Sequence, residues 1–137
     1  MKIFKTIPLF GLMLVAYTLI LAGFYYNNPS AHPMDHVIAN IVLPSHQAWT
    51  LRVGDAVVLF GLILLFAEIL KSTNASDTTV IEHVLSTFVF IFYMIAFLLA
   101  PMVANSTFLI LTMMSLIDVI AGFNITINTA RRDFTVG

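Results

Sequence analysis

Long runs of apolar residues, separated by short polar connections, dominate the pattern along the chain. The runs cover about residues 7–24, 55–70, 79–100 and 106–129. A helix needs ~17–25 mostly apolar residues to cross a lipid bilayer, and all four runs reach or approach that length. The pattern therefore predicts an all-α integral membrane protein, in which residues 1–137 form a single four-transmembrane-helix bundle.

The first apolar run also has features of a secretory signal peptide, because Lys2 and Lys5 precede it. The segment after the run, residues 25–29, contains no small-x-small cleavage site. We therefore expect an uncleaved first span, with Tyr25 and Tyr26 at the membrane–water interface.

The longest polar connection, residues 27–53, contains two β-prone stretches. Ile38–Leu43 and Ala48–Val53 are separated by the turn-forming residues Pro44–Gln47. Two such stretches around a short turn predict a small extracytoplasmic β-hairpin, lying on the membrane surface. Trp49 is expected to anchor this hairpin at the level of the lipid headgroups.

The composition supports a lipid environment and excludes several function classes. Hydrophobic residues make up 60% of the chain and charged residues only 9%, whereas a soluble domain has roughly 25% charged residues. There is no cysteine, so disulfides and thiolate metal sites are excluded. The six Lys and Arg residues are scattered and the net charge is −1, which argues against a nucleic-acid partner.

The basic residues predict how the spans are oriented. If the N-terminus is cytoplasmic, the outer segments hold Arg52 alone. The inner segments then hold five basic residues: Lys2, Lys5, Lys71, Arg131 and Arg132. Lys and Arg are enriched in cytoplasmic segments. We therefore expect an N-in/C-in topology.

Asp118 is the ionisable residue set deepest within an apolar run. Small and polar residues share its helical face, as is usual for helix–helix interfaces in lipid. This face comprises Thr107, Leu111, Ser115, Asp118, Gly122 and Ile125. An intramembrane acid suggests a functional site, but no second acid or base is evident at the same depth. We expect a packing acid bonded to a hydroxyl such as that of Ser86, Thr87 or Tyr93.

Glu68 and His83 fall near the inner ends of the second and third runs. Glu68 and Lys71 are three residues apart, as in an ordinary supporting ion pair. Histidine can exchange a proton near neutral pH. His83 could thus line a short proton path with Glu68 and Asp118, although the outer half offers no residue to continue it.

No other pattern points to a metal, cofactor or catalytic site. His32, Asp35, His36 and His46 lie in the outer loop and could hold a divalent metal or copper. Pro33 disfavours the helical spacing that would bring these ligands together. Haem needs histidines inside two spans, and only His83 is near one. No nucleophile–base arrangement or phosphate-binding loop is visible. We expect a solvated outer loop and a protein that is not an enzyme and holds no cofactor or metal.

Several short motifs of the chain resemble those of a known protein family. They are Leu43-Pro44-Ser45, Ala48-Trp49-Thr50-Leu51, Gly54-Asp55, Glu68-Ile69 with Lys71, Glu82-His83-Val84-Leu85-Ser86, Asp118-Val119, Ala121-Gly122-Phe123 and Ala130-Arg131-Arg132-Asp133-Phe134. Together, over residues 40–137, they resemble a family of small, uncharacterised four-span bacterial inner-membrane proteins. The resemblance implies the inner (cytoplasmic) membrane of a bacterium and brings no assigned activity.

These features favour a non-enzymatic accessory or scaffold subunit of a larger membrane complex or of a homo-oligomer. Its partners would be the lipid bilayer and either another membrane protein or further copies of the chain. The alternative is an oligomeric proton or cation conductor that uses Asp118.

Overall fold

The computed structural model describes residues 7–73 and 79–136 of the chain. Lys2, Lys5 and most of the connection between the second and third apolar runs lie outside the described residues. The elements are α2 (Leu9–Asn27), η1 (Pro33–Asp35), β1 (Val37–Val42), β2 (Ala48–Arg52), α3 (Val53–Thr73), α4 (Thr79–Leu99), η2 (Pro101–Val103) and α5 (Ser106–Val136).

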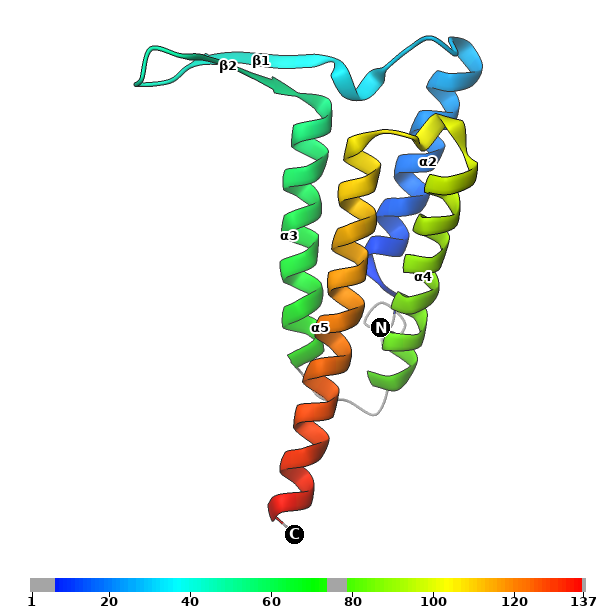
Figure 1. Ribbon diagram of the computed structural model, residues 1–137, viewed down its shortest axis with the longest axis vertical. Helices are drawn as coiled ribbons and strands as arrows, with labels where there is room; N and C mark the ends of the chain where they lie inside the picture. Colours follow the sequence, from blue (N-terminus) through cyan, green and yellow to red (C-terminus); the bar gives the residue numbers. More distant parts are fainter. Residues whose placement is uncertain (1–6, 74–78, 137) are drawn as a thin grey trace.

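The four long helices run alongside one another, and the hairpin β1–β2 projects sideways from one end of the bundle (Figure 1). We call this end the hairpin end. The C-terminus lies at the opposite end, where α5 extends beyond its neighbours (Figure 1). All four helices are long and apolar enough to cross a membrane, as the sequence predicts.

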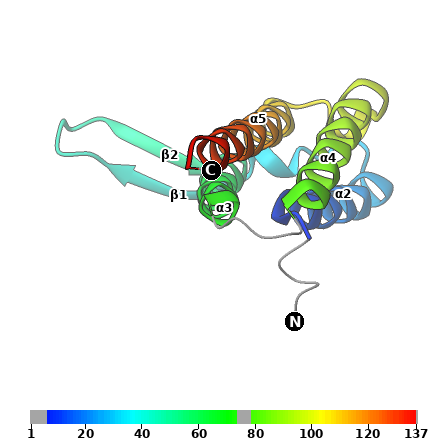
Figure 2. The same cartoon turned by 90° about the horizontal axis from the view of Figure 1, so that it is seen from below.

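Helix α5 is the central packing element. It makes the most extensive contacts, with α3 and with α4, whereas α2 packs mainly against α4, α3 and η2. The same arrangement is visible along the bundle, where α5 lies beside α3 and α2 lies beside α4 (Figure 2). Within its apolar window 44% of the residues of α5 are buried, against 22% in α2 and α3 and 17% in α4. The polar face of α5 is therefore enclosed by the other helices.

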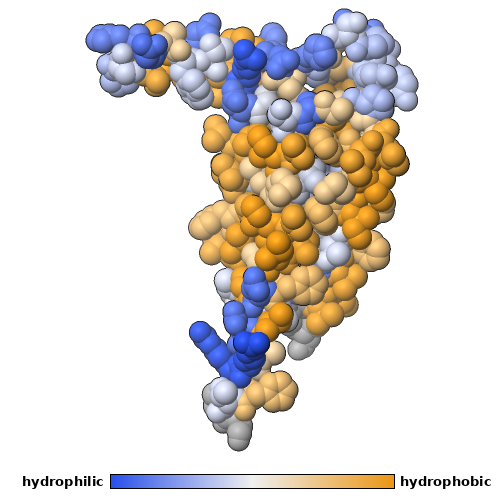
Figure 3. Space-filling view, viewed as in Figure 1, coloured by the Kyte–Doolittle hydropathy of each residue, from blue (hydrophilic) through white to orange (hydrophobic). Residues whose placement is uncertain are grey.

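The exterior of the bundle is apolar. A broad hydrophobic band covers the helices, and hydrophilic residues gather at the hairpin end and on the projecting end of α5 (Figure 3). The exposed side chains of this band are large and hydrophobic, among them Leu19, Ile63, Phe66, Leu98 and Ile120. In water such a surface would be far larger than soluble monomers expose, so the band matches a lipid solvent.

The hairpin forms with the strands and turn that the sequence predicts. Antiparallel β1 and β2 pair Ile41 with Trp49 and Asn40 with Thr50, and a bulge interrupts the register between Val37 and Ala39. Because paired residues share a face of a hairpin, Ala39, Ile41, Leu43, Trp49 and Leu51 form an apolar face. Asn40 and Thr50 lie on the other face and are joined by a side-chain hydrogen bond of 2.9 Å. Trp49 therefore lies on an apolar face, whereas the opposite face combines Asn40 and Thr50 with Val42 and Ala48.

Side-chain oxygens stabilise the starts of α3 and α5. Helix α3 begins at Val53, so Asp55 is a first-turn acid whose Oδ2 accepts the backbone N–H of Arg52 at 2.9 Å. Helix α5 begins at Ser106, but Asn105 supplies the cap: its Oδ1 accepts the Phe108 N–H at 2.9 Å. An asparagine oxygen satisfies a first-turn N–H as well as a serine would.

The fourth helix ends later than the apolar run that predicts it. Helix α5 continues seven residues beyond Thr129, to Val136. The polar residues of this segment end the apolar run without ending the helix, because Ala130, Arg131 and Arg132 are good helix formers.

Candidate functional site

Among the residues that the structure describes, six buried polar side chains lie along the inside of the helix bundle, on α5 and on its neighbours α3 and α4. At most 8% of the surface of each is exposed. They are Glu68, His83, Ser86, Thr112, Ser115 and Asp118. In lipid, such groups must find partners within the protein.

Glu68 and Lys71 of α3 hold the first turn of α2. The Glu68 Oε1 accepts a hydrogen bond from the Leu9 N–H, and the Lys71 Nζ donates to the Ile7 carbonyl at 3.2 Å. The Lys71 Nζ also lies 3.5 Å from the Glu68 Oε2. A carboxylate is stabilised at a helix N-terminus, where backbone N–H groups lack partners. The Glu68–Lys71 ion pair, which the sequence predicts within one helix, therefore also joins α3 to the start of α2. We call this set of contacts the clasp.

His83 joins α4 to α5. Its Nε2 lies 2.6 Å from the Oγ1 of Thr126, whose hydroxyl donates to the Gly122 carbonyl at 3.0 Å. Because the Thr126 hydroxyl donates its hydrogen to that carbonyl, its oxygen accepts the hydrogen bond from Nε2. The imidazole lies directly against Gly122, where a Cβ would come within 2.6 Å of two ring atoms. Gly122 thus allows the close approach of α4 and α5.

Gly122→Ala should therefore destabilise the helix pair by about 1–3 kcal/mol, the usual cost of overpacking. The matched control is Gly23→Ala, because a Cβ at Gly23 has no neighbour within 4 Å. Thermal unfolding of both variants in the same detergent measures the difference. Equal stability of the two variants would show that His83 moves aside at no cost.

Asp118 has close polar neighbours on two other helices. Its carboxyl is hydrogen-bonded with Ser86 of α4 and interacts electrostatically with Glu68 and Lys71 of α3. The expectation that no second acid or base lies at its depth is therefore wrong, since Glu68 and Lys71 are near enough to interact. The acid lies where α3, α4 and α5 meet.

The hydroxyls above Asp118 on α5 bond to their own helix. Thr112 donates to the Phe108 carbonyl at 2.9 Å and Ser115 to the Thr112 carbonyl at 2.8 Å. Ser and Thr satisfy their hydroxyls in this way when they must lie in an apolar interior. The hydroxyl hydrogens of these two side chains are therefore donated within α5, and the side chains contribute to packing.

An aromatic layer lies between this polar region and the hairpin end. The ring centroid of Phe108 lies 5.4 Å from that of Tyr17 and 5.2 Å from that of Tyr93. The Tyr17 hydroxyl donates to Asn105 Oδ1 at 3.1 Å and the Tyr93 hydroxyl to the Phe10 carbonyl at 3.1 Å. All three rings are buried. They fill the bundle interior between the acids and the hairpin end.

The loop between α2 and β1 forms no metal site in the described part of the chain. Neither there nor elsewhere in residues 7–73 and 79–136 do three or more potential ligands from His, Cys, Asp and Glu converge. Asp35 instead lies 3.6 Å from Arg52, and both side chains are more than half exposed.

Comparison of the chain with protein-family models, with curated proteins and with solved structures finds no match. The resemblance to small four-span bacterial proteins thus stays a prediction.

The sequence predicts that polar or small residues of the membrane interior form the site: Asp118, Ser115, Gly122, Glu68 and His83. In the structure the carboxyl groups of Asp118 and Glu68 interact electrostatically, and His83 lies against Gly122. Ser115 donates its hydroxyl to the Thr112 carbonyl within α5.

The sequence does not predict the roles of Lys71, which lies 3.5 Å from Glu68, and of Thr126, which lies 2.6 Å from His83. The feature of the sequence that could have indicated these roles is the polar character of both residues near the ends of predicted spans.

Proposed function

We propose that this protein is a non-enzymatic membrane subunit, acting as a scaffold within a larger membrane complex or a homo-oligomer. The observation that carries the proposal is how the interior ionisable groups are used. Glu68 and Lys71 bind the start of α2, His83 binds α5 and Asp118 bonds with Ser86. Each group joins one helix to another.

Satisfied polar groups support this role. Every buried side-chain nitrogen or oxygen within the described residues has a hydrogen-bond partner. A site that moves ions needs groups that can change partners, whereas a polar network without spare partners rigidifies a bundle. The aromatic layer of Tyr17, Tyr93 and Phe108 adds an apolar barrier.

The proposed location is a bacterial inner membrane, with both termini in the cytoplasm and the hairpin outside. The apolar band of the bundle supports insertion, and the positions of the basic residues support the orientation. The hairpin projects across the bundle axis and therefore along the membrane surface (Figure 1). Its apolar face would rest on the lipid with Trp49 among the headgroups.

A proton or cation conductor is the second candidate, because two carboxyl groups interact inside the bundle. Asp118 and Glu68 could exchange a proton if water reached them. Four spans rarely enclose a pathway, so this function requires several copies around a shared channel.

Extraction of the tagged protein in a mild detergent, followed by mass measurement of the intact complexes, tests the subunit function. We expect a defined complex, either with one membrane partner at fixed stoichiometry or with a fixed number of copies. A protein that elutes only as a monomer under conditions that preserve other membrane complexes would contradict the proposal.

A further inference from the structure

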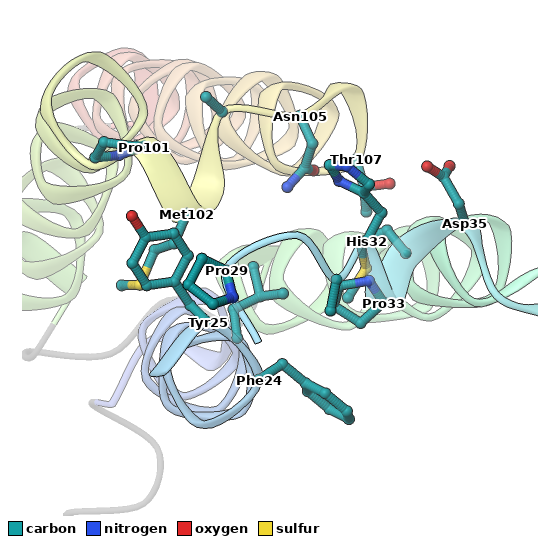
Figure 4. A pocket seen from close by; sticks show the side chains of 14 residues that line it. Phe24, Tyr25, Pro29, His32, Pro33, Asp35, Pro101, Met102, Asn105 and Thr107 are labelled. Atoms are coloured by element: carbon teal, nitrogen blue, oxygen red, sulfur yellow. The ribbon is translucent and has the colours of Figure 1, made fainter. Parts of the chain in front are cut away.

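Two adjoining cavities form a cleft at the hairpin end of the bundle. The first has a volume of about 190 Å³ and lies between the end of α2, the loop that follows it, η2 and the start of α5. Its wall includes Tyr25, Pro29, His32, Met102 and Asn105, whose side chains surround a common space (Figure 4). Polar and apolar groups both line it.

The second cavity is a mostly apolar groove of about 590 Å³. It shares Phe24 and residues 31–35 with the first cavity and adds Ile20, His36 and Val53. A volume of this size lies within the ~300–1,000 Å³ typical of small-molecule sites. The two cavities together offer a polar end and an apolar end.

The groove is accessible from the lipid-facing side of the bundle. Ile20 and Phe24 line the groove, and they are also 57% and 50% exposed on the flank of α2. They lie in the last two turns of α2, next to the polar hairpin end. In a membrane, this position corresponds to the acyl chains just below the headgroups.

The polar groups beside the groove carry charges of both signs. Asp35 lines both cavities, and its carboxylate lies 3.6 Å from the Arg52 guanidinium. Their side chains are 70% and 54% exposed, so each retains capacity for another partner. An anion next to a cation is complementary to a zwitterion, with the ammonium of the ligand on Asp35 and its phosphate on Arg52.

We propose that this cleft binds one zwitterionic aminophospholipid from the outer leaflet. One acyl chain lies in the groove against Ile20 and Phe24, and the headgroup lies beside Asp35 and Arg52. The site would fix a lipid between α2 and the start of α3. It rests on membrane insertion with the hairpin outside, as proposed above, but not on whether the protein conducts ions or acts as a subunit.

The test uses full-length protein in nanodiscs containing equal amounts of phosphatidylethanolamine and phosphatidylglycerol. After extraction in mild detergent, mass spectrometry counts the phospholipid retained per chain. We expect one retained phospholipid, enriched in phosphatidylethanolamine. No retained lipid, a preference for phosphatidylglycerol, or closure of the groove by a second copy of the chain would each overturn the proposal.

Paired tryptophan variants locate the bound lipid. Ala31→Trp fills the space shared by both cavities and should abolish retention, whereas Ser30→Trp, one residue away and lining neither, should retain the lipid. Ile20→Trp and its neighbour Leu19→Trp form a second pair on α2, in case Ala31→Trp does not fold. Retention in folded Ala31→Trp or Ile20→Trp at the wild-type level would place the lipid elsewhere.

A separate substitution tests the contact between the lipid headgroup and Asp35. Asp35→Asn removes the anion but leaves the groove, so one lipid should remain bound while the preference for phosphatidylethanolamine falls about two- to fivefold, as expected for an exposed ion pair. An unchanged preference would contradict the assignment of Asp35 to the ammonium group.

Discussion

Replacing Glu68 by alanine should lower the free energy of unfolding by about 3 kcal/mol, between the cost of leaving a buried polar group unpaired and that of breaking a fully buried ion pair. The substitution leaves the Lys71 ammonium and the Leu9 N–H without the carboxylate that binds them. The side chain of Glu68 is 5% exposed, so little water can take its place. Unfolding of purified protein by titration with a denaturing detergent measures the loss.

Glu68→Gln is the matched control, because its amide oxygen can still accept the Leu9 N–H while the negative charge is gone. We expect it to lie between the wild type and Glu68→Ala in stability. Because the clasp holds the start of α2, protease sensitivity should also increase near Ile7 and Leu9 in the alanine variant. Wild-type stability in Glu68→Ala would show that the clasp contributes nothing to the bundle.

Asp118→Leu is the second substitution with a large expected effect. It leaves the Ser86 hydroxyl without its partner in the interior, which costs about 1–3 kcal/mol. It also removes the neighbour through which α5 interacts with Glu68 and Lys71. Lower thermal stability and weaker assembly in detergent are the expected results, whereas Asp118→Asn should preserve both, since an amide can donate and accept. Equal losses in the two variants would show that the carboxyl group itself is required.

The helices and the hairpin could be predicted because their signals are local. Long apolar runs, the β-prone stretches around Pro44–Gln47 and the polar connections are all read from neighbouring residues. The last part of α5 was missed because hydropathy indicates where a membrane span ends, whereas backbone hydrogen bonding and helix propensity determine where the helix ends.

The contacts of the candidate site could not be predicted because they join residues distant in the chain. Leu9 and Glu68 are 59 positions apart and His83 and Thr126 are 43 apart. Glycine at position 122 indicated close helix packing, but only the fold identifies the His83 ring as the group that fills the space. The proximity of Asp118 to Glu68 likewise depends on how α3 and α5 align.

Ion flux in reconstituted vesicles tests most directly whether the buried acids hold helices together or move ions. Asp118 lies 12 residues beyond Ser106, about 18 Å along the helix, within the hydrocarbon of an inserted bundle. Asparagine cannot bind and release a proton, so Asp118→Asn would abolish any flux carried by this residue without removing its packing role. We expect wild-type protein and Asp118→Asn to assemble equally, with proton and cation flux no higher than in protein-free vesicles. A wild-type flux that disappears in the assembled asparagine variant would contradict the scaffold function and establish the conductor.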